Sequence, residues 1–406
     1  MDSQVNAAAR ALATGDVLLA LKHVGRRDDP PALALRGVAM AQLGELGRAR
    51  ELLHVAARAF GNAEPLARAR CITAEAEIAL AARDLSPNDA GLVGARKVLE
   101  ARGDRRNALH ARCIEIRRLV ILGRIERAER ALAALDRTGA SPALEAIASL
   151  LDASVALRRI RVDAARAALD HAEASARHAG VGALLAEIAA ARAALTAPAA
   201  RRLGDGQESA LLLEDVATIH ASGALVIDGC RRVVRAGAAE VALGRRPVLF
   251  ALARALAEAW PGDVARTGLI ARAFGATRIN ESHRARLRVE IGRLRRAVRE
   301  LAVIEATERG FVLRAPHASS VVCLAPPTED EHGNLLALLA DGNAWSSSAL
   351  ALALGASQRT TQRALVALEA AGKIRAFGRG RAQRWVAPAL VGFTTVLLLP
   401  GPVVEG

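Results

Sequence analysis

The chain has 406 residues, which is enough for two to four domains that each bury a core. Its 56 Lys and Arg residues against 42 Asp and Glu residues give a net charge of +14, which favours an anionic partner such as nucleic acid. The chain has no tyrosine and only 2% aromatic residues, so it lacks the stacking surfaces of single-strand and RNA binders, and duplex DNA is favoured.

Cysteine use and hydropathy indicate a reducing, aqueous compartment. The cysteines Cys71, Cys113, Cys230 and Cys323 lie forty residues or more apart, and they match neither a metal-binding pair nor a disulfide framework. The opening Met-Asp-Ser-Gln lacks the basic and apolar regions of a signal peptide, and no run of eighteen apolar residues follows. We therefore expect a soluble, cytoplasmic protein.

Residues 1–198 are rich in Ala, Leu and Arg, and their Gly and Pro residues fall between apolar-periodic segments, which predicts helices throughout. The sequence of residues 43–53, Leu-Gly-Glu-Leu-Gly-Arg-Ala-Arg-Glu-Leu-Leu, returns in similar form at residues 122–132 and more loosely at 159–169. The repeated small residue is represented by Ala20, Ala49, Ala95, Ala128 and Ala165.

The spacings between these alanines are 29, 46, 33 and 37 residues, which scatter around the ~34 residues of a tetratricopeptide repeat. In this irregular form the region resembles that family. The resemblance implies stacked helix pairs with a concave surface that binds a protein partner, a peptide or a ligand. A plain bundle of Ala-rich helices is the alternative.

In residues 196–210, small, polar, Gly and Pro residues replace the apolar period, which predicts a linker over residues 199–210. Short strand-like runs follow at 211–213, 224–228, 231–235 and 240–243, separated by glycines, and they predict a small antiparallel sheet. Helical patterns then cover residues 245–259 and 267–274, with a stop at Trp260-Pro-Gly-Asp263.

The next helix, predicted over residues 280–301, carries seven arginines against three glutamates. Leu287, Ile291, Leu294 and Val298 recur every three or four residues, so they can face a core while the opposite face presents guanidinium groups. Arginine is suited to phosphates and guanine edges because its donors form a fixed fork. A solvated helix in an Arg-rich protein is the alternative.

Residues 303–307 and 310–314 complete the region as a predicted hairpin that turns at Glu308 and Arg309. Over residues 222–315 this order of sheet, three helices and hairpin resembles the effector domain of OmpR/PhoB-type response regulators. The matching residues are Val241-Ala-Leu243, Pro261 to Leu269, Val289 to Arg296 and Ile304 to Leu313. The resemblance implies a winged helix over residues 211–318, whose third helix enters the major groove of DNA while its hairpin touches the adjacent minor groove.

By this resemblance, the residues that read bases or phosphates are Asn280, His283, Arg284, Arg286 and Arg288. Those expected to clamp phosphates are Arg293, Arg295 and Arg296, with Arg309 at the tip of the wing. The chain departs from the family in having no aspartate-bearing receiver domain before the module and in having Phe311 where the family usually has Gly-Tyr. Control by phosphorylation of a receiver is therefore not implied.

After a joint at residues 319–331, a second unit is predicted over residues 332–388. Its short helices, a Gly turn at Gly355, a helix over residues 357–371 and a basic glycine hairpin resemble the winged helix-turn-helix of MarR- or DeoR-type regulators. The polar side chains expected to point outward and contact DNA are Ser357, Gln358, Arg359, Thr361, Gln362 and Arg363. The arginines expected at or near the tip of its wing are Arg379, Arg381 and Arg384. Use of this domain only for protein contacts is the alternative.

The fold class is therefore predicted as multidomain and mainly α, with tetratricopeptide-like helical repeats followed by two α+β winged-helix domains. The β-type tail at residues 389–406 is predicted to add a strand or to join two subunits. Phosphate-loop, zinc-protease and serine-elbow motifs are missing from the sequence, so we expect no enzymatic activity, no cofactor and no metal.

The predicted function is sequence-specific binding of double-stranded DNA by a bacterial-type transcriptional regulator. Its helical half would sense a protein partner or peptide, for which RNA polymerase is one candidate, and a homodimer is compatible with this function. The alternatives are a protein-interaction scaffold whose winged helices dock proteins, and a nucleoid-associated protein that binds DNA without sequence preference.

Overall fold

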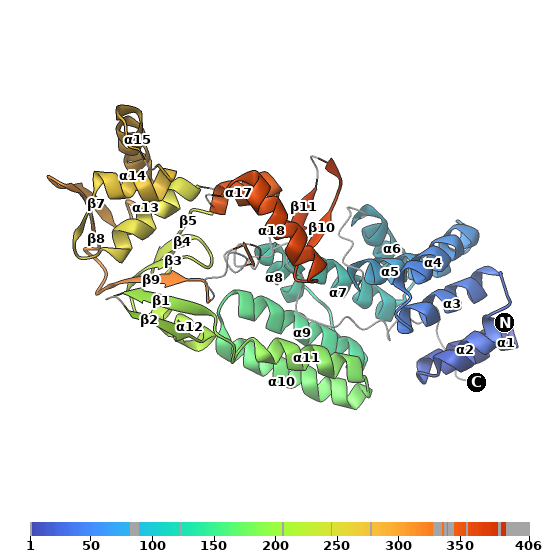
Figure 1. Cartoon of the computed structure of the whole chain (residues 1–406). Coiled ribbons are helices and arrows are strands. Elements are labelled where there is room, and N and C mark those ends of the chain that lie inside the picture. Colours follow the sequence, from blue (N-terminus) through green and yellow to red (C-terminus); the bar gives the residue numbers. More distant parts are fainter. Residues whose placement is uncertain are drawn as a thin grey trace. The chain divides into compact units, whose positions relative to one another are not determined.

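The computed structural model describes residues 2–81, 89–121, 124–204, 207–244, 246–276, 278–327, 335–336, 339, 345–354, 356–380 and 383–386. The chain forms two compact units whose main boundary lies between residues 192 and 193. The first unit is helical, and the second combines helices with sheets (Figure 1). No helix in these ranges combines the length and apolar character that a membrane crossing requires.

The first unit confirms the helical prediction for the N-terminal half. Its helices are α1 (Ser3–Ala13), α2 (Val17–Val24), α3 (Pro30–Gln42), α4 (Leu46–Phe60), α5 (Pro65–Ala81), α6 (Asp89–Ala101), α7 (Arg105–Ile121), α8 (Ile125–Ala133), α9 (Pro142–Arg158), α10 (Val162–Ala179) and α11 (Gly182–Ala193). Helices that follow one another pack side by side, as α3 does with α4 and α4 with α5. The unit is therefore a stack of neighbouring helix pairs.

One type of turn recurs between these helices. Gly15, Gly44 and Gly103 adopt positive φ values of 80°, 86° and 73°, a conformation that glycine takes without steric cost. After each glycine, the next amide donates to a carbonyl five residues earlier: Asp16 to Ala11 (2.8 Å), Glu45 to Met40 (2.9 Å) and Asp104 to Leu99 (2.9 Å). Ile160 takes the place of the glycine before α10, with φ 57°. A turn of the same form therefore recurs between successive helices of the first unit.

The alanines of the repeated sequence lie inside the helix pairs. All of the predicted small residues are buried, namely Ala20, Ala49, Ala95, Ala128 and Ala165. Helices α3 and α4 approach each other so closely that a Cβ added to Gly37 would lie 2.7 Å from Cγ of Leu53. Small side chains are required at these contacts because larger ones would separate the paired helices.

The second unit is built on a mixed six-stranded sheet with the order β2-β1-β9-β3-β4-β5. Its strands are β1 (Ala200–Gly204), β2 (Gln207–Leu211), β3 (Leu225–Asp228), β4 (Val233–Ala236), β5 (Ala239–Ala242) and β9 (Val321–Ala325). Neighbouring strands are antiparallel except β3 and β9, which run parallel with Leu225 opposite Val321. Helix α12 (Leu213–Ala221) connects β2 to β3.

This sheet corrects several predictions. The linker expected at residues 199–210 contains β1 and most of β2, and the joint expected at 319–331 contains β9. The strand expected at 211–213 is instead the end of β2 and the start of α12, and the sheet is mixed rather than antiparallel. These segments become strands because β1 pairs with β9, Arg201 lying opposite Ala325. That pairing is non-local, so local composition did not reveal it.

The three predicted helices and the predicted hairpin follow β5, together with a strand, β6, that was not predicted. They are α13 (Pro247–Glu258), α14 (Arg266–Phe274), α15 (Glu281–Val298), β6 (Asp263–Ala265), β7 (Val303–Ala306) and β8 (Gly310–Arg314). Strands β7 and β8 form the expected hairpin, and β6 pairs with the outer side of β8. The predicted stripe of Leu287, Ile291, Leu294 and Val298 is buried in the core, together with side chains of α13, α14 and the hairpin. The stripe fixes which face of α15 remains exposed.

The end of the described chain forms a smaller core. It contains α17 (Ser347–Leu354), α18 (Gln358–Ala370), β10 (Arg375–Phe377) and β11 (Arg384–Val386). The side chains of Leu350, Leu365, Leu368 and Trp385 are buried in this core, and β10 pairs with β11. The helices and strands agree with the sequence prediction, whereas Gly355 and the tail at 389–406 lie outside the described residues.

Candidate nucleic-acid interface

Helix α15 begins at a well-defined cap. Asn280 Oδ1 accepts a hydrogen bond from the amide of His283 (3.0 Å), and His283 Nδ1 accepts one from the amide of Asn280 (3.4 Å). The His283 ring also stacks on Phe274 of α14, with 6.4 Å between ring centroids. Two predicted DNA-reading residues therefore hold the start of the helix, because caps of this kind satisfy amides that have no partner within the helix.

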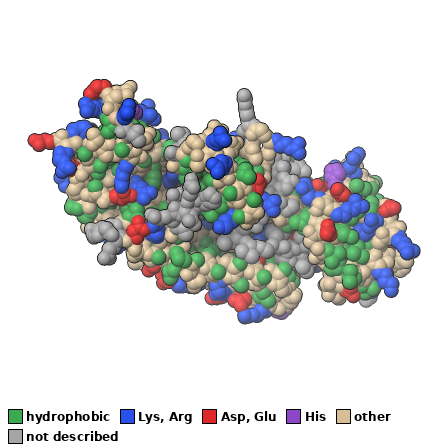
Figure 2. Space-filling view, in the orientation of Figure 1, with side chains coloured by type: hydrophobic (Ala, Val, Ile, Leu, Met, Phe, Trp, Pro, Cys, Tyr) green, Lys and Arg blue, Asp and Glu red, His purple; other side chains and the backbone are tan. Residues whose placement is uncertain are grey.

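The exposed face of α15 differs from the predicted row of guanidinium groups. The line directly opposite the buried stripe runs through Ser282, Ala285 and Val289 and continues to Arg296, and these residues are all exposed. The arginines lie on the two flanks of this line, with Arg284, Arg288 and Arg295 on one side and Arg286 and Arg293 on the other. In Figure 2 the surface over α15 carries blue basic and red acidic side chains beside tan surface. From Ser282 to Val289 the helix thus presents a narrow neutral crest between two basic flanks, and Arg296 lies on the same line nearer the C-terminus.

On the first flank, the arginines differ in how firmly they are held. Arg295 donates from Nε to the carbonyl of Ile304 (2.7 Å) and lies over the ring of Phe311, so it is fixed against the hairpin. Arg284 pairs with Glu281 (2.8 Å), one turn earlier on the same helix. Arg288 is exposed. The guanidinium of Arg288 can therefore reach a ligand at little cost, since it gives up no buried contact.

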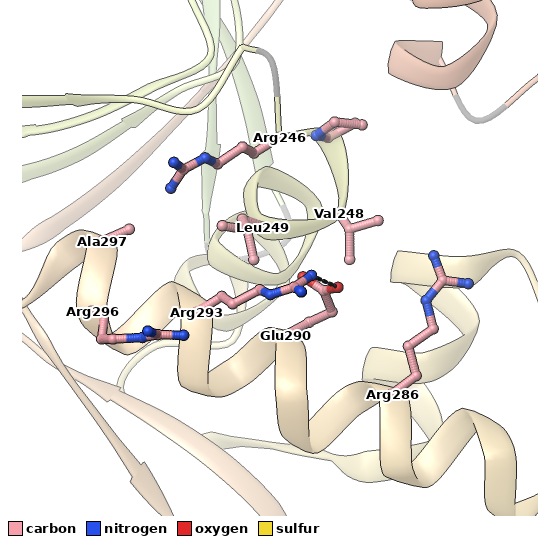
Figure 3. A pocket seen from close by; sticks show the side chains of 9 residues that line it. Arg246, Val248, Leu249, Arg286, Glu290, Arg293, Arg296 and Ala297 are labelled. Carbon is pink, nitrogen blue, oxygen red and sulfur yellow. Dashed lines mark hydrogen bonds and ion pairs between the residues drawn. The ribbon is translucent and has the colours of Figure 1, made fainter.

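On the second flank, a basic groove of ≈ 660 Å³ separates α15 from the start of α13 (Figure 3). Its lining residues are Arg246, Pro247, Val248, Leu249, Arg286, Glu290, Arg293, Arg296 and Ala297. Arg293 is paired with Glu290 (2.8 Å), which leaves an excess of positive charge in the groove. The groove can therefore hold an anionic group beside a small apolar floor.

Two arginines of this groove rest on neighbouring groups. Arg286 lies over the ring of Phe274, 4.5 Å from its centroid, and Arg296 donates to the carbonyl of Gly292 (3.4 Å). Arg246, which precedes α13, belongs to the groove but not to the predicted site residues. This position could not be predicted from local sequence, because only the packing of α13 against α15 brings Arg246 near the arginine-rich helix.

The turn of the β7–β8 hairpin is basic and well supported. Arg309 at this turn is 78% exposed, 3.9 Å from Asp263. Arg266, which was not predicted as a site residue, donates to the carbonyls of Glu308 (2.7 Å) and Thr307 (3.0 Å). The turn is therefore rigidly attached to the start of α14, while the guanidinium of Arg309 extends into solvent.

Helix α18 presents most of the predicted polar residues to solvent. Gln358, Arg359, Gln362 and Arg363 are exposed, and Ser357 caps the helix by accepting from the amide of Thr360 (3.1 Å). Thr361 is a correction, because it was predicted to point outward and is only 1% exposed. Its spacing from the buried residues at 364, 365 and 368 places it on the inner face of the helix.

The β10–β11 hairpin carries the remaining predicted arginines. Arg379 is exposed beyond β10, whereas Arg384 is half-buried within β11, opposite Phe377, and donates to the carbonyl of Gln383 (2.9 Å). Arg381 lies outside the described residues. Of the two described arginines, Arg379 is available to a ligand approaching the turn, and Arg384 contributes to the strand.

Burial raises the pKa of each of the four cysteine thiols to about 12, and all four are free. These thiols are therefore poor nucleophiles and poor metal ligands at neutral pH. Among the described residues, exposed groups suited to an anionic or base-edge ligand lie around α15 and on the polar face of α18. No protein-family model, curated protein or solved structure matches the chain.

Proposed function

We propose that this protein is a transcriptional regulator that binds duplex DNA with sequence specificity, and that α15 is its main recognition helix. The observation that carries the proposal is the form of α15. It is a capped helix of 18 residues with four buried anchors, and its exposed crest lies between two basic flanks. The major groove is wide enough for one helix and is bordered by a phosphate backbone on each side. A helix whose crest is neutral from Ser282 to Val289 and whose flanks are basic matches this shape and charge.

In this proposal the region from β3 to β8 is a winged helix of the OmpR/PhoB type. Arg284 and Arg288 face one backbone, and Arg286 and Arg293 face the other. Arg309 at the hairpin turn reaches toward the adjacent minor groove. Most affinity comes from contacts between arginines and phosphates, while the side chains near the N-terminal half of α15 discriminate between sequences.

We further propose that α17, α18 and the β10–β11 hairpin form a second winged helix. Support comes from the exposed Gln358, Arg359, Gln362 and Arg363 on one capped helix and from Arg379 beside it. Amide and guanidinium groups are the side chains that pair with adenine and guanine edges in the major groove.

For the first unit we propose tetratricopeptide-like repeats that bind a protein partner or a peptide. The recurring glycine turn and the buried alanines support this reading, because they are the features that allow helix pairs to stack in series. Two winged helices and a binding surface in one cytoplasmic chain suit a regulator that couples a partner to a DNA site.

Selection of bound sequences from a random duplex pool tests the proposal. The full chain is expected to enrich a defined sequence, and the spacing of any half-sites would show whether a dimer binds. Binding without enrichment would instead identify a nucleoid-associated protein. Failure to retain any duplex at low salt would contradict the proposal and favour a protein-interaction scaffold.

A further inference from the structure

The crest of α15 carries an exposed apolar side chain in its middle. Val289 is 53% exposed, and it lies opposite the buried stripe of the helix. Single exposed apolar residues are common on protein surfaces and need no function by themselves. The surroundings of Val289 are what give it significance, because basic side chains border it on both flanks.

The same arrangement occurs in α18. In α15, Arg286 and Val289 lie six and nine residues after the cap Asn280, and in α18, Arg363 and Val366 lie six and nine residues after the cap Ser357. Val366 is 59% exposed on the face opposite Leu365 and Leu368. Two helices of different length and different cores thus place an arginine and a valine at the same outward positions.

From this arrangement we propose that Val289 is a specificity-determining residue that contacts the 5-methyl group of a thymine in the major groove. The inference rests on the proposed function of α15. Among the groups that base pairs present in the major groove, the thymine methyl is the apolar one, whereas the others donate or accept hydrogen bonds. Valine can meet this methyl group without leaving a polar atom unpaired.

The shape of the crest permits such a contact. A Cβ built on Gly292 would have no heavy atom within 4 Å, and Ala285 on the other side of Val289 carries a single methyl group. Within one turn of Val289, therefore, no long side chain on the crest holds the valine away from the floor of the groove. Valine is also stiff at χ1 in a helix, so it loses little conformational entropy when it binds.

The charges around Val289 disfavour a second copy of the chain as its partner. A symmetric contact centred on Val289 would bring Arg286, Arg288 and Arg293 against the same residues of the other copy. Like charges at a desolvated interface oppose association, whereas the phosphates on both sides of a major groove neutralise them. DNA is therefore the occupant that fits both the apolar crest and the basic flanks.

The test uses the full chain and a duplex obtained from the random pool. Each thymine of the bound sequence is replaced in turn by deoxyuridine, which removes the methyl group alone. At one thymine we expect affinity to fall about three- to fivefold, as for one buried methyl-sized group. The variant Val289→Ala should bind the original duplex with a similar loss and should not distinguish thymine from deoxyuridine at that position.

Val55→Ala is the matched control, because Val55 is 51% exposed on α4 of the helical unit. It should retain the full preference for thymine. If Val289→Ala binds duplex DNA yet keeps the same response to every deoxyuridine, the inference is wrong while the proposed function stands. If Val289→Ala instead changes the sedimentation of the protein without DNA, the valine is a protein contact and the inference is also wrong. Failure of the unmodified chain to bind any duplex would overturn the proposed function itself.

Discussion

At the scale of single residues, two glycines three positions apart in the α3–α4 pair have opposite conformational requirements. Gly44 has φ 86° in the turn, a region that side chains with a Cβ rarely adopt. Gly47 lies in the first turn of α4, and a Cβ added to either glycine would have no heavy atom within 4 Å. The backbone conformation, rather than a clash, therefore decides what a methyl group does at each position.

Gly44→Ala is accordingly expected to lower the free energy of unfolding by about 1 kcal/mol, because alanine is strained at positive φ. Gly47→Ala is its matched control and should raise that free energy by roughly 0.5–1 kcal/mol, since alanine favours the helix. Urea denaturation followed by far-ultraviolet circular dichroism measures both. Equal effects of the two substitutions would contradict the turn conformation.

His220 on α12 gives the second unit a dependence on pH. Burial lowers the pKa of His220 to about 4, although the Asp228 carboxylate lies 3.6 Å away. Arg235 donates to its Nδ1 (3.1 Å), which requires that nitrogen to be unprotonated. Because the folded pKa lies below the unfolded value, stability is complete above ~pH 6.5 and falls as pH drops from there toward 4.

Between pH 7 and pH 5 the unmodified protein should therefore lose roughly 1–2 kcal/mol more than His220→Gln. The three tryptophans, Trp260, Trp345 and Trp385, all lie in the second unit, so their fluorescence during urea denaturation reports on this unit. A pH dependence that is the same in both proteins would show that His220 is not held neutral.

At the scale of secondary structure, the hairpin beside α15 depends on one close backbone crossing. Strands β6 and β8 pair with Ala265 opposite Gly310, and a Cβ added to Gly310 would lie 1.8 Å from the carbonyl oxygen of Val264. The hairpin in turn supports Arg295 and carries Arg309. Glycine is thus required where the hairpin meets the strand before α14.

Gly310→Ala should lower the free energy of unfolding of the second unit by at least about 2 kcal/mol, since backbone must move to admit the methyl group. Gly292→Ala, in open space on α15, should be neutral or stabilising. Tryptophan fluorescence during urea denaturation compares the two variants. If Gly310→Ala were as stable as Gly292→Ala, the pairing of β6 with β8 would be wrong.

The elements also show which parts of the fold were predictable from sequence. Helix α15 and its buried stripe were predictable because the spacing of Leu287, Ile291 and Leu294 is a local signal. Strand β1 was not, since Arg201 and Arg202 lack a strand pattern and are held by pairing with the distant β9. Strand β9 did carry a signal in its Val-Val-Cys-Leu-Ala sequence, but the adjoining prolines suggested a joint.

The candidate site divides in the same way. The arginines of α15 were predictable as a group. Their separation into two flanks around Val289 could also have been derived, because the buried stripe sets the helical spacing. Burial of Thr361 could have been derived from its spacing relative to Leu365 and Leu368. The contribution of Arg246 could not, because it depends on how α13 packs against α15.

At the scale of the whole molecule, the chain combines a unit of stacked helix pairs with a unit that carries the candidate DNA-binding helices α15 and α18. The net charge of +14 is a property of the full chain, so it does not by itself assign DNA binding to α15. Any basic surface attracts DNA over long range. A specific contact between an arginine and a phosphate also releases a counterion, so loss of that contact lowers the number of ions released on binding. The dependence of affinity on salt concentration separates these two effects.

The most direct test is therefore a titration of labelled duplex with the full chain by fluorescence anisotropy at several salt concentrations. We predict that Arg288→Ala weakens binding to all duplexes and reduces the slope of log affinity against log salt by about one, as for one lost phosphate contact. Arg58→Ala removes the same charge from an exposed position on α4 and should leave the slope unchanged. Identical slopes for Arg288→Ala and the unmodified protein would contradict the assignment of α15 as the DNA-binding helix.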